Sequence, residues 1–398
     1  MIKGIAKRWR LLSGQDNWKN LLEPLDLDLR RYIIHCGERA QATYDTFDYC
    51  KVSKYAGSST YAKSALFKSV GLLKGNPFKY RVVKYLYATS KISVPDAFIM
   101  KSLSNQSIFK ESNFIGYVAL ATDEGKIALG RRDILIAWRG TITATEWLND
   151  FDFPLVPASM IVGNSSNANV HQGFLSIYTS SNPDSIYNIS SARDQVLHEV
   201  KKLVEDFKNE EISITVTGHS LGGALSILNA ADIVANGYNK TKGQPNKTCM
   251  VTGIVFGSPR VGDSEFTDAF QSLNDLHLLS VKNVPDIVPD IPPFPYDSNI
   301  GTELQIDSRN SPYLKNTPLN YMAFHLLEAA YLHNIAGTQG ARGGFHLEIK
   351  RDISLVNKDQ DILKEEYLVP PDWWCLKNKG MVQQDDGSWK LDDHNRDD

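Results

Sequence analysis

A serine framed by glycines, between a strand-like and a helix-like segment, constrains the fold of this chain more than any other feature. Residues 218–222 read GHSLG, which is a G-x-S-x-G pentapeptide. The run Ile212 to Thr217 before it is rich in β-branched residues, and the apolar run Leu221 to Leu228 after it is typical of a buried helix. In this setting the pentapeptide predicts a nucleophile elbow, a tight strand-to-helix turn that holds Ser220 in a strained backbone conformation.

The glycines of this motif have a steric explanation. Gly218 and Gly222 remove side chains that would collide with each other at the turn, and Gly223 and Ala224 let the helix approach the sheet. A helix that begins directly after the serine points its first amides at the oxyanion that forms during acyl transfer. Ser220 is therefore the predicted nucleophile.

Strand-like and helix-like segments alternate along the middle of the chain. This alternation predicts an α/β-hydrolase fold, with a mostly parallel central sheet flanked by helices. Residues 123–125, Asp-Glu-Gly, predict a turn that leads into a short strand. The other expected strands are Ile134 to Trp138, Ile212 to Thr217, Val251 to Phe256 and Leu278 to Val284, and the expected helices are 191–209, 221–236 and 323–334.

The organisation of the whole chain follows from its patterning and from the absence of a linker. Residues 1–75 predict a helical N-terminal extension, in which Leu27 to Phe47 carries apolar residues at helical intervals. Residues 76–350 form the expected catalytic core, and residues 351–398 form a C-terminal extension with the acidic tail DDHNRDD. No composition shift divides the chain, so we expect a single domain over residues 1–398.

A serine nucleophile needs a general base, and the base needs a carboxylate. In this fold the three residues follow the chain order Ser, Asp, His. Asp286 comes directly after the expected strand Leu278 to Val284, where the strand end delivers a carboxylate to the site. Asp290, four residues later, is the nearest competitor. Asp286 is the predicted acid.

Four histidines follow Asp286 in the chain. His394 lies in the acidic tail, and His346 follows a glycine-rich loop. His325 lies where irregular chain turns into a helix, which suits a base carried on a loop at the edge of the sheet. We favour His325 as the base, and His333 remains the alternative.

The segment after the strand Ile134 to Trp138 predicts the second half of an oxyanion hole. Arg139, Gly140 and Thr141 follow this strand directly, and the Thr141 amide is expected to join the Leu221 amide as a donor. The next segment, residues 143–151, is short and amphipathic. It predicts a lid, and a helix packed permanently on the core is the alternative. The expected lid residues are Glu146, Trp147, Leu148 and Phe151.

Composition and charge exclude several classes of function. The chain has 43 basic and 46 acidic side chains, a net charge of -3, so nothing favours a nucleic-acid partner. Its apolar runs are far shorter than the roughly 20 residues of a membrane span, so we expect only transient contact with a membrane or lipid-droplet surface.

The N-terminal segment lacks the apolar core of a secretory leader, which favours a location in the cytosol. Four widely spaced cysteines predict free thiols, and no spacing predicts a metal or another cofactor.

With these residues in place, the chain resembles the class 3 (fungal-type) lipases, and more closely the plant class II phospholipases A1. The likeness spans nearly the whole chain. It is carried by IAKRWRLLSGQDNWKNLLEPLDLDLRRYIIH, IAWRGT, EWLNDFDF, VHQGF, GHSLGGALS, FGSPRVGD, KNVPDIVPD, FHLLEAAYLHNIAGTQG and CLKNKGMVQQDDGSW.

The resemblance implies a serine hydrolase that cleaves the sn-1 acyl ester of glycerophospholipids such as phosphatidylcholine, with Ser220, Asp286 and His325 as its triad. Other outcomes are a triacylglycerol or galactolipid lipase, another carboxylesterase, or a lipase-like signalling protein without turnover. One feature departs from the family pattern, because this chain has one residue more between His325 and His333 than is usual.

Overall fold

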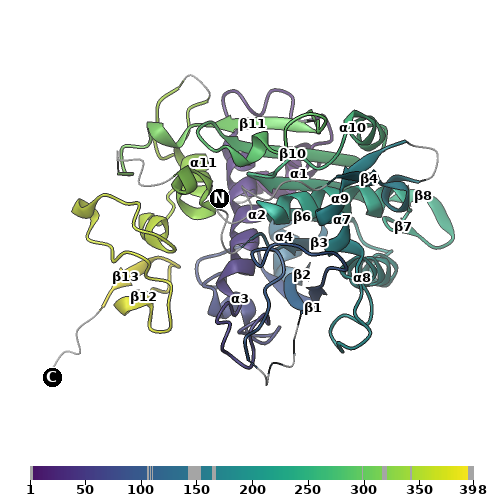
Figure 1. Ribbon diagram of the computed structural model, residues 1–398. Helices are drawn as coiled ribbons and strands as arrows, with labels where there is room; N and C mark the ends of the chain where they lie inside the picture. Colours follow the sequence, from purple (N-terminus) through teal and green to yellow (C-terminus); the bar gives the residue numbers. More distant parts are fainter. Residues whose placement is uncertain are drawn as a thin grey trace.

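The computed structural model describes residues 3–104, 107, 109, 111–141, 154–163, 167–297, 299–315, 321–340 and 343–392. Its centre is a seven-stranded sheet with the order β1-β2-β3-β6-β9-β10-β11 (Figure 1). The pairs from β3 to β11 are parallel, and β1 and β2 are antiparallel additions at one edge. The strands are β1 Tyr80–Ala88, β2 Asn113–Ala121, β3 Arg132–Trp138, β6 Ile212–His219, β9 Met250–Phe256, β10 Leu276–Asn283 and β11 Thr302–Ile306.

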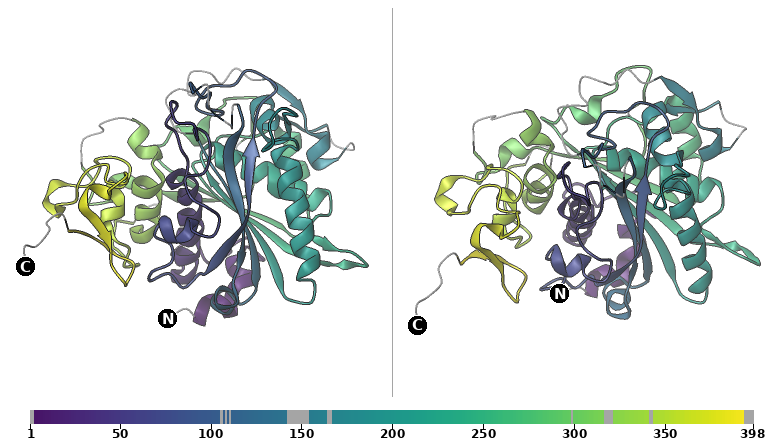
Figure 2. Two further views of the ribbon diagram at one scale, coloured as in Figure 1. Left: turned by 90° about the horizontal axis from the view of Figure 1, so that it is seen from below. Right: turned by 60° about the horizontal axis from the view of Figure 1, so that its bottom comes forward.

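Helices cover both faces of this sheet, as Figure 2 shows. The strand β3 illustrates this cover, since all seven of its residues are buried. Ile134 and Ile136 pack in the core on one face, with α7, α8 and α9, whereas Leu135 and Ala137 pack in the core on the other face, with α1 and α2. A strand covered on both faces is apolar throughout, as the sequence is here. The mostly parallel, helix-flanked α/β fold is therefore confirmed.

The remaining elements are short or lie at the ends of the chain. The α-helices are α1 Lys3–Leu12, α2 Leu27–Asp45, α3 Leu66–Ser69, α4 Asp123–Leu129, α6 Ser159–Val162, α7 Gln172–Thr179, α8 Ala192–Asp206, α9 Leu221–Ala235, α10 Ser264–Gln271 and α11 His333–Gly337. The short strands are β4 Leu155–Pro157, β5 Asn169–His171, β7 Lys240–Thr241, β8 Gln244–Thr248, β12 Met381–Gln383 and β13 Trp389–Leu391. Among the helices so described, none is long and apolar enough to cross a membrane.

The turn and short strand expected at residues 123–125 are wrong, because this segment is the helix α4. The Thr122 side chain accepts a hydrogen bond from the Gly125 amide and caps the helix, and two acidic residues occupy its first turn. Gly130 ends the helix with a φ of 79°, in the left-handed region. The N-cap at Thr122 and the C-terminal Gly130 favour a helix more strongly than the sequence Asp-Glu-Gly favours a turn.

The helix expected at residues 323–334 is interrupted. A 3-10 turn, η3 Tyr321–His325, is followed by Leu326 in extended conformation, then by the π-helix η4 Leu327–Leu332 and by α11. A π-helix closes its hydrogen bonds over five residues rather than four. The segment between His325 and His333 is therefore not one regular α-helix.

The C-terminal segment packs beside α2. The segment after residue 351 lies along this helix, as the yellow ribbon in Figures 1 and 2 shows. Lys358 pairs with Asp45 at 2.5 Å, and Gln41 donates to Asp359 at 3.1 Å. Since the Lys358 and Asp45 side chains are only 4% and 3% exposed, the pair joins two buried surfaces.

The start of α2 offers a test of local stability. The Asp26 carboxylate accepts from the Asp28 and Leu29 amides at 2.9 and 3.1 Å and pairs with Arg8 at 2.9 Å. We expect Asp26→Ala to lower the free energy of unfolding by about 1 kcal/mol, because the helix loses its N-cap. Asp26→Asn keeps an acceptor for the amides and is the matched control. Urea denaturation checks this, and equal losses in both variants would contradict the role of the cap.

The pH dependence of this contribution has a definite sign. Partial burial opposes ionisation, but the hydrogen bonds from Arg8 and from the two amides outweigh it and lower the pKa of Asp26. A carboxyl group with a lowered pKa in the folded state stabilises the fold above its unfolded pKa. The difference between wild type and Asp26→Ala should therefore shrink as the pH falls through the acidic range.

Candidate active site

Ser220 occupies the sharp turn between β6 and α9. Its φ of 57° and ψ of -131° lie in a region that L-residues rarely adopt. The side chain is 1% exposed, and its Oγ has no hydrogen-bond partner in the described part of the chain. This buried hydroxyl is therefore free to donate its proton to an acceptor inside the site.

The glycines around Ser220 allow close contacts, although not quite those expected. A Cβ on Gly218 would overlap the Gly222 carbonyl, whereas a Cβ on Gly222 would overlap the Trp138 carbonyl. The two glycines thus avoid clashes with backbone rather than with each other's side chains. A Cβ on Gly223 would lie 2.7 Å from the Ser258 Cβ, so this glycine lets α9 approach the chain that follows β9.

The structure brings Asp286 and His325 together beside Ser220. Asp286 follows the end of β10, and its Oδ2 lies 2.7 Å from Nδ1 of His325. The other ring nitrogen of His325, Nε2, is buried without a partner among the described residues, as is the Ser220 Oγ. Both Ser220 and His325 line one cavity of about 530 Å³. The structure thus contains the His-Asp pair of a Ser-His-Asp triad, with Ser220 lining the same cavity as the histidine.

The competing residues lie elsewhere. Asp290 is 73% exposed at its side chain and faces Arg260 at 3.8 Å. His333 pairs through Nε2 with the Ser311 hydroxyl at 2.8 Å and stacks on Phe345. Burial lowers the pKa of His333 to about 3, so it remains neutral. His333 does not line the cavity that contains Ser220, whereas His325 does.

A tyrosine that sequence reasoning missed completes the support of Asp286. The Tyr331 hydroxyl, on η4, donates to Asp286 Oδ2 at 2.5 Å, and the Val288 amide donates to Oδ1 at 3.0 Å. Burial and the neighbouring Asp286 raise the pKa of Tyr331 well above its ordinary value, so the hydroxyl keeps its proton. Only the irregular helix after His325 places Tyr331 under the carboxylate.

We expect Tyr331→Phe to lower kcat/KM about tenfold, the cost of one hydrogen bond to a charged group. Without this bond Asp286 is held less firmly against Nδ1 of His325, so the loss should fall on kcat rather than on KM. The matched control is Tyr178→Phe, which removes the bond from a buried tyrosine to Asp232. An unchanged kcat in Tyr331→Phe would reduce Tyr331 to a packing residue.

His219, the residue before the nucleophile, links the two catalytic loops. Its Nε2 lies 2.7 Å from the His325 carbonyl oxygen, and its Nδ1 lies 2.9 Å from the Tyr44 hydroxyl. Burial, followed by the nearby His325, holds the pKa of His219 well below its ordinary value, so the ring is neutral. A carbonyl only accepts, so Nε2 carries the proton and Tyr44 donates to Nδ1. This chain of bonds positions the loop that carries His325.

The expected oxyanion donors follow two neighbouring strands, β3 and β6. Thr141 follows β3, is 6% exposed and lines the cavity, and Leu221 is the first residue of α9. Buried Arg139 holds the strand end, because its guanidinium donates to the Phe114 and Gly140 carbonyls at 2.9 Å each. Burial lowers the pKa of Arg139 to about 10, which leaves it charged at neutral pH.

The expected lid, with Glu146, Trp147, Leu148 and Phe151, lies outside the described residues. The far wall of the cavity was not expected from the sequence. It comes from the C-terminal segment and includes Asp359, Gln360, Trp374 and Cys375. No cluster of His, Cys, Asp and Glu side chains suited to a metal ion occurs within the part of the chain described here.

Comparisons with known proteins agree with this geometry. The family model "Lipase (class 3)" matches residues 135–296, which contain the elbow and Asp286. Phospholipase A1-IIgamma of Arabidopsis thaliana is 52% identical over 397 residues, which cover 99% of this chain and 94% of that protein. Phospholipase A1-II 1 of Oryza sativa subsp. indica is also 52% identical, over 99% of this chain and 98% of that protein.

Fungal lipases are among the solved structures that align with part of the chain. The Lip2 lipase from Yarrowia lipolytica is 18% identical with a TM-score of 0.46, over 72% of this chain and 81% of that one. The full-length likeness to curated relatives is far stronger. The chain belongs to the plant phospholipase A1-II family of class 3 lipases.

Proposed function

We propose that this protein hydrolyses the sn-1 acyl ester of glycerophospholipids such as phosphatidylcholine through an acyl-enzyme. The observation that carries the chemistry is the buried contact between His325 and Asp286 beside the unpartnered hydroxyl of Ser220. The support for the sn-1 position and for a phospholipid is the name phospholipase A1 of relatives that match along nearly the whole chain.

In the acylation step, His325 Nε2 takes the proton of Ser220 while Oγ attacks the ester carbonyl carbon. The carbonyl oxygen becomes an oxyanion that accepts hydrogen bonds from the Thr141 and Leu221 amides. Asp286, held by Tyr331 and Val288, keeps Nδ1 of His325 protonated and stabilises the imidazolium. The bond to the glycerol oxygen then breaks, and the lysophospholipid leaves with the proton from His325.

In the deacylation step, water takes the place of the alcohol. His325 removes a proton from the water, which attacks the acyl carbon, and the same two amides hold the second oxyanion. The bond to Ser220 Oγ breaks, Oγ regains its proton from His325, and the fatty acid is released. No step requires a metal or an organic cofactor.

The test uses phosphatidylcholine with different labelled acyl chains at sn-1 and sn-2. Purified protein and its Ser220→Ala variant are incubated with this lipid, and the products are identified by mass spectrometry. Release of the sn-1 chain by the wild type alone is the expected result. Release of the sn-2 chain, or Ser220-dependent cleavage of only a neutral lipid or short ester, would keep the hydrolase and reject the phospholipase A1.

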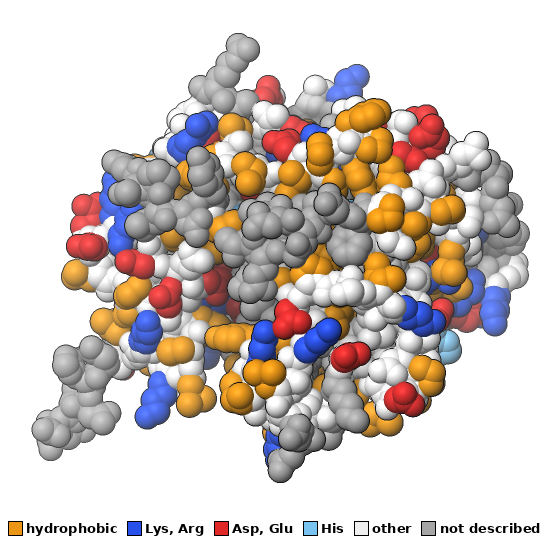
Figure 3. Space-filling model, viewed as in Figure 1, with side chains coloured by type: hydrophobic (Ala, Val, Ile, Leu, Met, Phe, Trp, Pro, Cys, Tyr) orange, Lys and Arg blue, Asp and Glu red, His pale blue; other side chains and the backbone are white. Residues whose placement is uncertain are grey.

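We further propose transient contact of the cavity mouth with a membrane or lipid-droplet surface. Phe294, on the loop after β10, is 92% exposed, and Leu376, next to Cys375 of the cavity wall, is 100% exposed. Figure 3 shows hydrophobic side chains gathered over the region that Figure 1 labels β10, α10 and β4. Exposed apolar side chains favour insertion among lipids, and Leu376 directly follows a residue that lines the cavity.

We expect Phe294→Asp combined with Leu376→Asp to reduce binding to phosphatidylcholine vesicles about tenfold, because two buried apolar contacts are replaced by charges. Cleavage of a soluble short-chain ester should stay unchanged. The matched control is Ile127→Asp, on α4 between β2 and β3, where the residue is 78% exposed. Vesicle flotation measures the binding, and equal loss in the control would contradict a specific membrane face.

We also propose that the protein works in the cytosol. All four cysteines, Cys36, Cys50, Cys249 and Cys375, carry free thiols, which suits a reducing compartment. Fractionation of cells that express the tagged protein tests this proposal, and recovery from the secretory pathway would reject it.

A further inference from the structure

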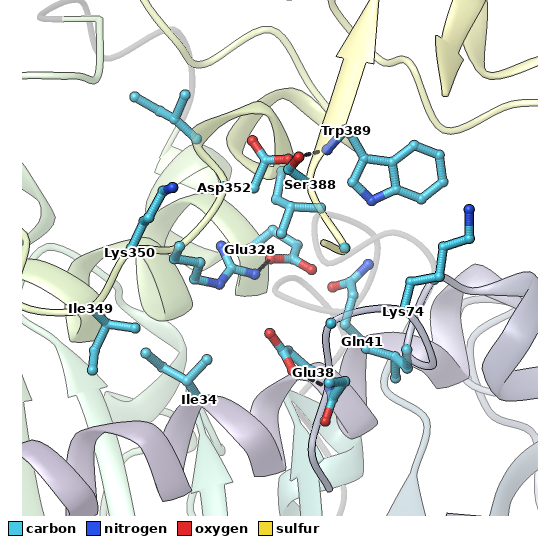
Figure 4. Close-up of a pocket in the computed structure, with 18 of the residues that line it drawn as sticks. Ile34, Glu38, Gln41, Lys74, Glu328, Ile349, Lys350, Asp352, Ser388 and Trp389 are labelled. Carbon is cyan, nitrogen blue, oxygen red and sulfur yellow. Dashed lines mark hydrogen bonds and ion pairs between the residues drawn. The ribbon is translucent and has the colours of Figure 1, made fainter. Parts of the chain in front are cut away.

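The C-terminal segment, residues 351–392, lines two cavities. It contributes the far wall of the catalytic cavity, and together with α2 it lines a larger cavity of about 1040 Å³. Figure 4 shows Gln41 of α2 and Asp352 of the C-terminal segment in the lining of the larger cavity. The two cavities share Gln41, Asp45 and Lys358. The contact between α2 and the C-terminal segment is therefore also a wall of the catalytic cavity.

A buried ion pair fixes the end of α2 to the C-terminal segment. Asp45 is the last residue of α2, and its carboxylate pairs with Lys358 at 2.5 Å. Gln41, one helical turn earlier, donates to Asp45 and to Asp359 at 3.1 Å each. The Lys358 ammonium group also lies 4.2 Å from the centre of the Trp374 ring. Separating the pair would leave a charge unpaired away from water, so these contacts hold the two segments in one arrangement.

Tyr44, the neighbour of Asp45, places its hydroxyl group among the catalytic loops. The hydroxyl oxygen lies 2.9 Å from Nδ1 of His219 and 3.3 Å from the His219 carbonyl oxygen. Burial raises the pKa of Tyr44 above its ordinary value, so the hydroxyl keeps one proton to donate. Because Nε2 of His219 donates to the His325 carbonyl, Nδ1 is the acceptor of that proton. Tyr44 thus fixes the tautomer of His219, and His219 holds the loop of His325.

The same hydroxyl group packs against the oxyanion loop. A Cβ on Gly140 would overlap the Tyr44 oxygen and would lie 2.5 Å from the His219 carbonyl oxygen. The φ of Gly140 lies outside the left-handed region, so lack of space rather than backbone conformation requires glycine here. Gly140 directly precedes Thr141, an expected oxyanion donor. One hydroxyl group therefore contacts the oxyanion loop and the elbow and, through His219, holds the loop of the base.

We propose that the C-terminal segment is part of the catalytic apparatus, because Lys358 fixes the end of α2 and thereby holds Tyr44 as a positioning residue between the catalytic loops. Neither residue takes part in bond formation. They keep the oxyanion donors and His325 in register while the transition state forms, when small displacements of catalytic groups slow the reaction most. The proposal rests on the serine hydrolase mechanism proposed above, but it does not depend on which lipid is cleaved.

The variant Tyr44→Phe tests the link between α2 and the catalytic loops. We expect it to lower kcat for a soluble short-chain ester about tenfold and to leave KM within about twofold, because the register of the loops matters in the transition state more than in substrate binding. The matched control is Tyr32→Phe, on the same helix, whose hydroxyl group contacts Thr215 and Arg131 instead. This control should lose stability in urea but keep kcat within about twofold.

The paired variant Lys358→Met/Asp45→Asn tests the link between the C-terminal segment and α2. It removes the ion pair without leaving Asp45 charged and unpaired. We expect kcat to fall about threefold or more in the wild-type background but not to fall further in Tyr44→Phe, because the ion pair acts through Tyr44. The matched control is Lys315→Met/Asp361→Asn, which removes a more exposed ion pair of the same segment. That control should leave kcat unchanged in both backgrounds.

Several results would overturn the proposal. Wild-type kcat in folded Tyr44→Phe would reject Tyr44 as a positioning residue. Additive losses in Tyr44→Phe and Lys358→Met/Asp45→Asn would mean that the ion pair does not act through Tyr44. An equal loss in Lys315→Met/Asp361→Asn would reduce the effect to general stability. If the wild type neither cleaves the ester nor reacts with a fluorophosphonate at Ser220, the hydrolase mechanism itself is rejected, and this proposal with it.

Discussion

Replacing Ser220 with alanine is expected to lower kcat for phosphatidylcholine by about 10⁴- to 10⁶-fold, the loss that follows removal of a triad nucleophile. The reason is chemical rather than structural. The Ser220 Oγ forms no hydrogen bond with the described residues, so its removal leaves no partner unsatisfied. Stability should therefore be retained, and relief of strain at the elbow is not expected because alanine has the same Cβ.

The measurement combines turnover with covalent labelling. A fluorophosphonate should label the wild type and fail to label Ser220→Ala, while both unfold at the same urea concentration. The matched control is Ser226→Ala, a buried serine of α9 that donates to the Gly222 carbonyl at 2.7 Å. This control should keep kcat within a few-fold. A Ser220→Ala variant with more than about 1% of wild-type turnover would reject Ser220 as the nucleophile.

The second large effect separates two histidines that are eight positions apart in the chain. We expect His325→Ala to lower kcat by about 10⁴- to 10⁶-fold, because Ser220 then has no base. His333→Ala should change kcat by only a few-fold and should lower the free energy of unfolding by about 1–3 kcal/mol, because its bond to Ser311 and its contact with Phe345 are lost.

Steady-state kinetics and urea denaturation of both variants check this expectation. His325→Ala should lose activity and keep its stability, whereas His333→Ala should keep its activity and lose stability. A reversed pattern, with His333→Ala inactive and His325→Ala active, would mean that the contact between His325 and Asp286 has no catalytic role. Activity lost in both variants at unchanged stability would make the two histidines act together.

The sequence predicted the parts of the site that depend on local chain geometry. The elbow around Ser220 requires glycines at fixed positions between a β-branched run and an apolar helix, and both runs appear in the sequence. Asp286 follows because the end of a parallel strand places its side chain at the same edge of the sheet as Ser220. These relations hold within a few residues of the chain, so the order of the amino acids is enough to recognise them.

The predictions from local sequence patterns were wrong at two segments where helix and turn signals compete. At residues 123–125 the sequence favours a turn, but the cap from Thr122 and the left-handed Gly130 form α4. Between His325 and His333 the apolar spacing suggests one continuous helix, yet the chain forms a 3-10 turn, an extended residue and a π-helix. Propensity alone does not separate these states, because packing against the sheet decides among them.

The sequence by itself determined the fold class. It also predicted Ser220 as the nucleophile, Asp286 as the acid and the loop after β3 as part of the site, because each of these follows directly on a regular element. Only the tertiary structure chose His325 over His333 as the partner of Asp286, found Tyr331 beneath that carboxylate, and joined residues 351–392 to α2 around two cavities. Such contacts join residues far apart in the chain. Their distances depend on how the elements pack, which no local pattern records.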